Sequence, residues 1–187
     1  MTLVLASQSA SRRAMLTAAN VPFVAVSAGV DEESAKAALL GEGLAARDMA
    51  DALAELKAIK VSSGEGQALV LGCDSVVALE DGSMLDKPRD RAEAGAHLRR
   101  LSGRRHELVS AAVMAEGGRP VWRVVDRARM HVRPLSEAFI ETYLDLEWPE
   151  ISGCVGCYRI EGSQFTVLGL PLLPVLDYLR VRGVMAS

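Results

Sequence analysis

Residues 3–16 join a short apolar run to a serine-rich turn and a pair of arginines. Residues 3–6 predict a buried strand, and residues 12–20 predict the following helix, with Ser11 as its N-cap. A helix N-terminus carries unpaired N–H groups and a partial positive charge, so Arg12 and Arg13 in the first turn are unfavourable unless an anion lies among them. The segment is therefore either a phosphate site or a strand and helix with two solvated surface arginines.

Length and charge exclude several classes of protein. The chain has 187 residues, half of them hydrophobic, which is enough to bury the core of one domain or two closely joined lobes. Its 24 acidic and 21 basic residues form no long blocks, which argues against a nucleic acid polymer as partner. No apolar run approaches the ~20 residues of a membrane span, and the chain does not begin with a secretion signal. We expect a cytoplasmic protein without a membrane partner.

The cysteines and histidines offer little support for a metal site. Cys154 and Cys157 form a C-x-x-C pair, but structural zinc needs two further ligands and only Cys73 remains. Two buried thiols are the favoured interpretation, and a redox or zinc module at this pair is the alternative. Three cysteines cannot all pair within the chain, which agrees with a reducing compartment. The histidines show neither zinc-site spacing nor helical i, i+4 pairing: His97, His106 and His131.

The rest of the chain alternates between strand and helix, which predicts an α/β fold with a mixed sheet. Gly117 and Gly118 suit the turn of an antiparallel pair. The predicted strands are residues 23–26, 68–73, 108–114 and 121–132. One predicted helix begins at Ser34, and the other predicted helices span residues 44–61, 90–103, 136–146 and 172–181.

Two features within these elements bear on chemistry. The apolar run 68–73 ends at Asp74 and Ser75 before residues 76–79 resume an extended pattern, so Asp74 is expected at the exit of a strand, where α/β sheets bind ligands. Lys57 and Lys60 lie beside the apolar stripe of helix 44–61, where a lysine usually extends to water, and spacing does not choose between them.

Paired arginines, the acidic cluster at residues 31–33, lysines and an aspartate together suggest a polyphosphate handled with a divalent metal. Phosphoanhydride hydrolysis needs cations to neutralise charge and a carboxylate to hold metal or accept a proton from water. Neither the phosphate-binding loop G-x-x-x-x-G-K-S/T nor a dinucleotide fingerprint is present.

The chain resembles the Maf family of nucleoside triphosphate pyrophosphatases over nearly its whole length. The order and spacing of several short segments carry the resemblance. They are Leu5-Ala-Ser-Gln-Ser-Ala-Ser-Arg-Arg13, with alanine where the family usually has proline, Asp31-Glu32, Lys57-Ala58, Gly72-Cys-Asp-Ser-Val76, Lys87-Pro88, Leu101-Ser-Gly103 with His106, and Val167-Leu-Gly-Leu-Pro171.

The resemblance implies a mixed, twisted sheet with flanking helices and two lobes around a central cleft, in a single domain spanning 1–187 without a separable linker. It also implies a homodimer that uses Mg²⁺ or Mn²⁺ to convert a nucleoside triphosphate to the monophosphate and pyrophosphate. Asp74 would be the catalytic carboxylate, activating water or binding metal, and Glu32 would assist with the metal. Lys57, selected over Lys60, and Lys87 would act beside them on the phosphates. The implied substrate-binding residues are Ser7, Ser9, Arg12, Arg13, Ser75 and Glu161.

The chain departs from the family near its C-terminus. Gly153-Cys-Val-Gly-Cys-Tyr-Arg-Ile-Glu-Gly162 is followed by only four residues before Val167, so two family segments have merged into one. Glu161 fills either the base-selecting position or the later turn. Ser75 with a glutamate favours modified guanine nucleotides such as 7-methyl-GTP over dTTP and UTP. The competing hypothesis is a nucleotide-binding regulatory protein, related to cell division, that has lost turnover.

Overall fold

An 11-residue strand, β3 (Leu69–Leu79), runs through the middle of the sheet. The computed structural model describes residues 3–64, 66, 68–148 and 158–185. Within them one seven-stranded sheet has the order β2-β1-β3-β5-β6-β7, with β4 paired to β3. Among the strand pairs of the described residues, β1–β2 and β1–β3 are parallel and the others are antiparallel. The predicted mixed sheet is therefore confirmed. The other strands are β1 (Leu3–Ala6), β2 (Phe23–Val26), β4 (Met84–Leu85), β5 (Arg105–Glu116), β6 (Arg119–Val132) and β7 (Tyr158–Glu161).

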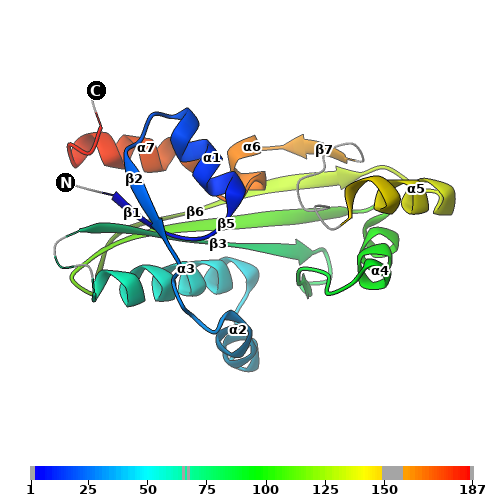
Figure 1. The fold of residues 1–187 in the computed structure, drawn as a ribbon. Helices are drawn as coiled ribbons and strands as arrows, with labels where there is room; N and C mark the ends of the chain where they lie inside the picture. Colours follow the sequence, from blue (N-terminus) through cyan, green and yellow to red (C-terminus); the bar gives the residue numbers. More distant parts are fainter. Residues whose placement is uncertain (1–2, 65, 67, 149–157, 186–187) are drawn as a thin grey trace.

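Helices cover both faces of the sheet near β1 (Figure 1). α1 (Ala10–Ala18), α6 (Gln164–Val167) and α7 (Leu172–Val181) lie on one face, where Leu16 and Leu179 are buried with Leu71 of β3. α3 (Ala46–Ser62) lies along the other face, with α2 (Glu32–Gly41) beside it. Because successive strand side chains point to opposite faces, Cys73 joins the first core and Val76 joins the α3 core. Asp74 therefore points to the α3 side, and Ser75 to the α1 side.

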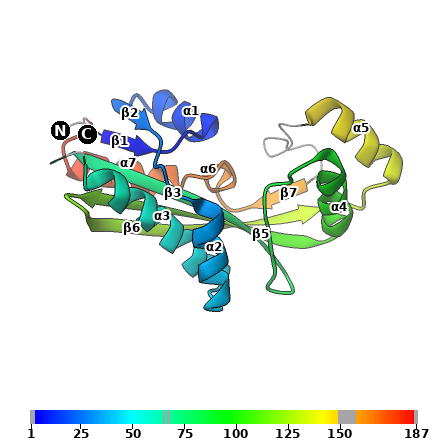
Figure 2. The same ribbon diagram turned by 60° about the horizontal axis from the view of Figure 1, so that its bottom comes forward.

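A second group of helices lies at the far end of the long strands β5 and β6 (Figure 2). α4 (Arg91–Leu101) and α5 (Glu137–Glu147) pack against each other through their own apolar cluster, which includes Ala94, Leu98 and Ile140. The predicted α/β class with flanking helices is thus confirmed, and the helices fall into two groups along one continuous sheet.

Several predicted elements match the structure closely. The strands at residues 3–6 and 23–26 and the helix at residues 172–181 have the expected bounds. Gly117 and Gly118 have φ of 53° and 77°, a conformation that glycine adopts readily, and they join β5 to β6 as expected. The sequence patterns did not reveal β4, β7 or α6, which are all short.

Two predictions at the ends of elements are wrong. Ser9, not Ser11, is the N-cap of α1: its hydroxyl accepts from the Arg12 backbone N–H at 3.4 Å, whereas the Ser11 hydroxyl donates to the Leu168 carbonyl. Asp74 does not end a strand, because β3 continues through it to Leu79. Within the described residues, no helix is both long and apolar enough to cross a lipid bilayer.

Candidate active site

Asp74 lies where one edge of β3 lacks a neighbouring strand. On that edge β1 pairs with β3 as far as Leu71, and β4 pairs with it from Val77, with no described strand paired between them. We call residues 72–76 the pairing gap. Asp74 is thus in mid-strand, but just beyond the carboxyl end of the parallel neighbour β1. The expectation that a ligand binds at this edge stays a prediction.

A lysine bridges two carboxylates on the α3 side of the pairing gap. Lys57 of α3 lies 2.6 Å from Asp74 Oδ1 and 3.0 Å from Glu32 Oε2, measured from its Nζ. Its side chain is 6% exposed and that of Asp74 is 10% exposed, whereas the Glu32 side chain is 59% exposed. Burial strengthens the attraction between the first two groups, while Glu32 closes the cluster from the solvent side. The three residues are far apart in the sequence and meet here.

Local structure explains why these side chains converge. Asp31 is the N-cap of α2, accepting from the Ser34 N–H at 3.0 Å, and this hydrogen bond lowers the pKa of the Asp31 carboxyl. Glu32, the first residue of α2, is then free to reach Lys57. One turn later on α3, Lys60 donates to the Gly29 carbonyl in the loop before α2. Lys57 and not Lys60 therefore reaches the cluster.

Arg12 holds the other side of the pairing gap. Its Nε donates to the Gly169 carbonyl at 2.7 Å, Nη1 to Ser7 Oγ at 3.2 Å, and Nη2 to Ser75 Oγ at 3.2 Å. Gly169 has φ of 93°, and a Cβ there would lie 3.1 Å from Ser75 Oγ and 3.3 Å from Arg12 Nη2. Glycine is needed at this position for both its backbone conformation and its close approach to the arginine.

Three further predicted residues lie on elements next to this arrangement. Ser9 caps α1, as described above, and Arg13 is exposed in the first turn of the same helix. Lys87 is exposed in the loop after β4. Its neighbour Asp86 forms an ion pair with Lys36 of α2, which places the loop beside the helix that supplies Glu32.

Glu161 is not brought to the pairing gap. It lies on β7, three strands from β3, which is about 14 Å across the sheet. Its carboxylate accepts from Arg159 at 2.7 Å and lies 3.2 Å from His131 Nε2, and these contacts lower its pKa. The base-selecting role implied for Glu161 stays a prediction.

Two other candidate reactive groups are inert at neutral pH. Burial raises the pKa of the Cys73 thiol to about 11, so it remains protonated. Burial lowers the pKa of His106 to about 4, so this histidine remains neutral. Cys154 and Cys157 lie outside the described residues. Among the residues that are described, no group of three or more histidine, cysteine or acidic side chains could hold a metal ion.

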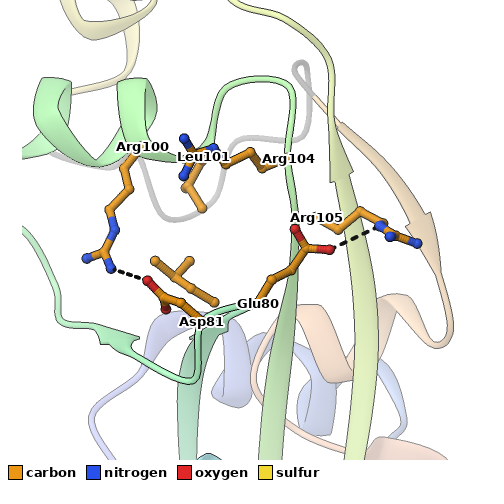
Figure 3. A pocket seen from close by; sticks show the side chains of 7 residues that line it. Glu80, Asp81, Arg100, Leu101, Arg104 and Arg105 are labelled. Atoms are coloured by element: carbon orange, nitrogen blue, oxygen red, sulfur yellow. Dashed lines mark hydrogen bonds and ion pairs between the residues drawn. The ribbon is translucent and has the colours of Figure 1, made fainter.

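A small pocket elsewhere on the molecule is not a better candidate for the active site than the pairing gap. Figure 3 shows arginines of the α4–β5 junction facing carboxylates at the end of β3, with Arg100 3.1 Å from Asp81 and Arg105 3.2 Å from Glu80. Exposed pairs of this kind contribute little free energy. Glu80 is six residues, about 20 Å, beyond Asp74 along the strand direction.

Asp74 and Glu32 nevertheless suit a hard divalent cation bound together with a ligand. Both offer carboxylate oxygens, and the Lys57 ammonium already lies between them as a cation. Mg²⁺ is commonly held by one or two carboxylates together with substrate phosphates, so a larger cluster of protein ligands is not required. The side chains therefore fit the metal that the resemblance implies.

Sequence reasoning missed Ser110, which contacts Ser75 from the neighbouring strand β5. The available signal was a single hydroxyl inside the apolar run 108–115, since a buried polar group requires a hydrogen-bond partner. The identity of that partner depends on strand register.

Known proteins resemble this chain over nearly its whole length. A curated relative from Sphingopyxis alaskensis, named nucleoside triphosphate pyrophosphatase, is 48% identical, and the match covers 98% of each chain. Nucleoside triphosphate pyrophosphatase 1 of a Jannaschia species is 47% identical, again covering 98% of each chain. A solved dITP/XTP pyrophosphatase from Mycobacterium abscessus matches with a TM-score of 0.47 at 17% identity, covering 98% of this chain and 94% of that one. A family model described as Maf-like protein matches residues 2–182, and the chain belongs to this family.

Proposed function

We propose that this protein hydrolyses the anhydride between the α and β phosphates of a nucleoside triphosphate, releasing the monophosphate and pyrophosphate. The observation that carries the proposal is that Lys57, Asp74 and Glu32 meet on one side of the pairing gap while Arg12 lies on the other. Such a set combines an acid beside the attacked phosphate with cations for the departing pyrophosphate. The names of the relatives favour turnover over the regulatory alternative.

Each side chain has a distinct task in this proposal. Asp74 orients the attacking water and accepts its proton, or binds metal, while Lys57 holds the Asp74 carboxylate in place. Arg12 and Arg13 neutralise the phosphate tail at the α1 N-terminus, with Ser7 and Ser9 lining the same turn. Lys87 contributes a further cation from the loop after β4. A bound Mg²⁺ or Mn²⁺ at Asp74 and Glu32 would screen phosphate charge and polarise the anhydride.

The proposal extends to the setting of the reaction. Residues 1–187 act as one domain. This is supported by the single continuous sheet along which both groups of helices lie. The chain works in the cytoplasm as a homodimer and requires no nucleic acid polymer. Its substrate is a modified nucleotide, with 7-methyl-GTP favoured over dTTP and UTP because the chain combines Ser75 with a glutamate, Glu161. A purified sample analysed by light scattering tests the dimer, and a nucleotide panel tests the substrate.

Removal of divalent metal is expected to stop the reaction. With Mg²⁺ or Mn²⁺ present, the purified protein should release pyrophosphate and a monophosphate from at least one nucleotide of a panel that includes 7-methyl-GTP, dTTP and UTP. Excess chelator should lower this rate to background, and added Mg²⁺ should restore it. Chromatographic product analysis provides the measurement. Nucleotide binding without any pyrophosphate would contradict the proposal and support the regulatory alternative.

Arg12→Ala is expected to weaken phosphate binding by about 10- to 100-fold, because hydrogen bonds to charged groups are typically stronger than neutral ones. The loss should appear in KM and in pyrophosphate affinity measured by calorimetry. Arg105→Ala provides the control, since Arg105 forms an exposed ion pair with Glu80 away from the pairing gap. Equal effects of the two substitutions on KM and pyrophosphate affinity would show that Arg12 does not bind the phosphates.

A further inference from the structure

Ser110 is a completely buried serine next to the pairing gap, and none of the steps above uses it. It lies directly opposite Ser75 in the β3–β5 register, and their Oγ atoms are 2.8 Å apart. Its hydroxyl also lies 2.8 Å from the Thr166 carbonyl of α6. A serine in the middle of an apolar strand therefore connects the gap to an element more than fifty residues away in the chain.

The chemistry of these groups gives the hydrogen bonds one direction. A carbonyl oxygen only accepts, so Ser110 donates its single hydroxyl hydrogen to Thr166. Ser75 must then donate its own hydrogen to Ser110. The Thr166 carbonyl also accepts from the Gly169 N–H at 3.1 Å, but the reverse arrangement would leave the Ser110 and Thr166 oxygens 2.8 Å apart with no hydrogen between them, which is unfavourable. Arg12 Nη2 donates to Ser75, so the chain of donors runs from Arg12 through Ser75 and Ser110 to α6.

The α6 segment holds the arginine at two atoms. Three residues after Thr166, the Gly169 carbonyl accepts from Arg12 Nε at 2.7 Å. The side chain of Thr166 in turn donates to Asp126 of β6, which fixes α6 to the sheet. Nε and Nη2 of one guanidinium are therefore held by the same short segment, the first directly and the second through Ser75 and Ser110. A planar guanidinium bound at two points keeps a defined orientation.

We infer that Ser110 is a positioning residue. It accepts the only hydrogen of the Ser75 hydroxyl, so Ser75 acts solely as an acceptor toward Arg12. The guanidinium of Arg12 is thereby oriented toward the phosphates. This inference rests on the phosphate-binding role proposed for Arg12. It also deepens that function, because Ser75 has no hydrogen left to donate to a phosphate oxygen. A substrate group that contacts Ser75 must therefore be a donor, such as a sugar hydroxyl or an N–H of the base.

The test is a double-mutant cycle between Ser110 and Ser75. Ser110→Ala should lower kcat/KM by about 3- to 10-fold, the range of one neutral hydrogen bond, with the change in KM and little change in kcat. In a Ser75→Ala background the same substitution should have no further effect, because the connection to Arg12 is already broken. Ser110→Thr retains the hydroxyl, so its KM should return most of the way to the wild-type value.

Ser62→Ala is the matched control. Ser62 is also completely buried and hydrogen-bonded, accepting from the Gly118 N–H at 3.0 Å at the far end of α3. It should lose stability in urea unfolding without a change in KM. A Ser110→Ala loss that persists in the Ser75→Ala background, or that matches Ser62→Ala in every kinetic constant, overturns the inference while leaving the pyrophosphatase proposal intact. A wild-type protein that releases no pyrophosphate overturns both.

Discussion

Asp74→Asn is expected to lower the rate of pyrophosphate release by about 1,000-fold. Groups that move a proton or hold a catalytic metal commonly contribute factors of about 100 to 10,000. Asparagine nearly preserves the shape of the side chain, but it removes the negative charge and the proton-accepting oxygen. Steady-state kinetics with the best nucleotide of the panel provides the measurement, at metal concentrations high enough to saturate the wild-type protein.

The same substitution also affects stability, so the two effects need separation. Lys57 would keep only the exposed Glu32 as a carboxylate partner. Removal of one member of a buried ion pair costs about 3 to 5 kcal/mol, with the lower end expected here because Glu32 remains. Urea unfolding should show a folded population at assay conditions before activity is compared.

Asp51→Asn is the control for Asp74→Asn. Asp51 lies on α3 like Lys57, but it pairs at 2.7 Å with Arg123 of β6, two strands away from β3. Its loss should leave kcat and KM within about 2-fold of wild type, since partly exposed pairs contribute little. Retention of more than a tenth of wild-type activity in folded Asp74→Asn would exclude Asp74 as the catalytic carboxylate.

Local pattern was sufficient where an element buries one continuous face. The final helix, Leu172–Val181, and the strand Leu3–Ala6 follow directly from apolar spacing. The same reasoning failed at Asp74, because a polar pair inside an apolar run resembles a strand end. β3 tolerates Asp74 and Ser75 in mid-strand because β1 has already ended beside them and Lys57 and Ser110 supply partners. Those partners come from tertiary structure, which spacing does not encode.

Choice between similar residues also required the fold. Lys57 and Lys60 are one turn apart on α3, and both lie beside the same apolar stripe. Only the position of the loop before α2 shows that Lys60 is occupied by the Gly29 carbonyl. Ser9 and Ser11 present the same difficulty, since either spacing suits an N-cap. Ser11 is not the N-cap because its hydroxyl donates to the carbonyl of Leu168, which is 157 residues away in the sequence.

Gly72→Ala is expected to separate α3 from β3. A Cβ at residue 72 would lie 2.2 Å from the Ala54 carbonyl oxygen and 2.6 Å from the Ala58 nitrogen, both of them backbone atoms of α3. A backbone contact cannot be relieved by a rotamer change, so the helix itself must move. Overpacking of a core costs about 1 to 3 kcal/mol, and a rigid backbone clash belongs at or above the upper end of that range.

The displacement should also abolish catalysis in molecules that remain folded. Ala58 follows Lys57 directly, so a helix that retreats at Ala58 carries the Lys57 ammonium away from Asp74, two residues after Gly72. We expect Gly72→Ala to reduce kcat by at least about 100-fold, since misplacement by about 1 Å can cost that much.

Gly41→Ala separates the clash from the general effect of replacing glycine. Gly41 is the last residue of α2, and a Cβ there would meet nothing within 4 Å. Alanine at this helical position should raise stability by about 0.5 to 1 kcal/mol. Urea unfolding and kcat are measured for both variants beside the wild type. If Gly72→Ala unfolds at the wild-type urea concentration and retains wild-type kcat, then α3 does not lie against β3 as closely as described, and the buried Lys57–Asp74 contact loses its structural basis.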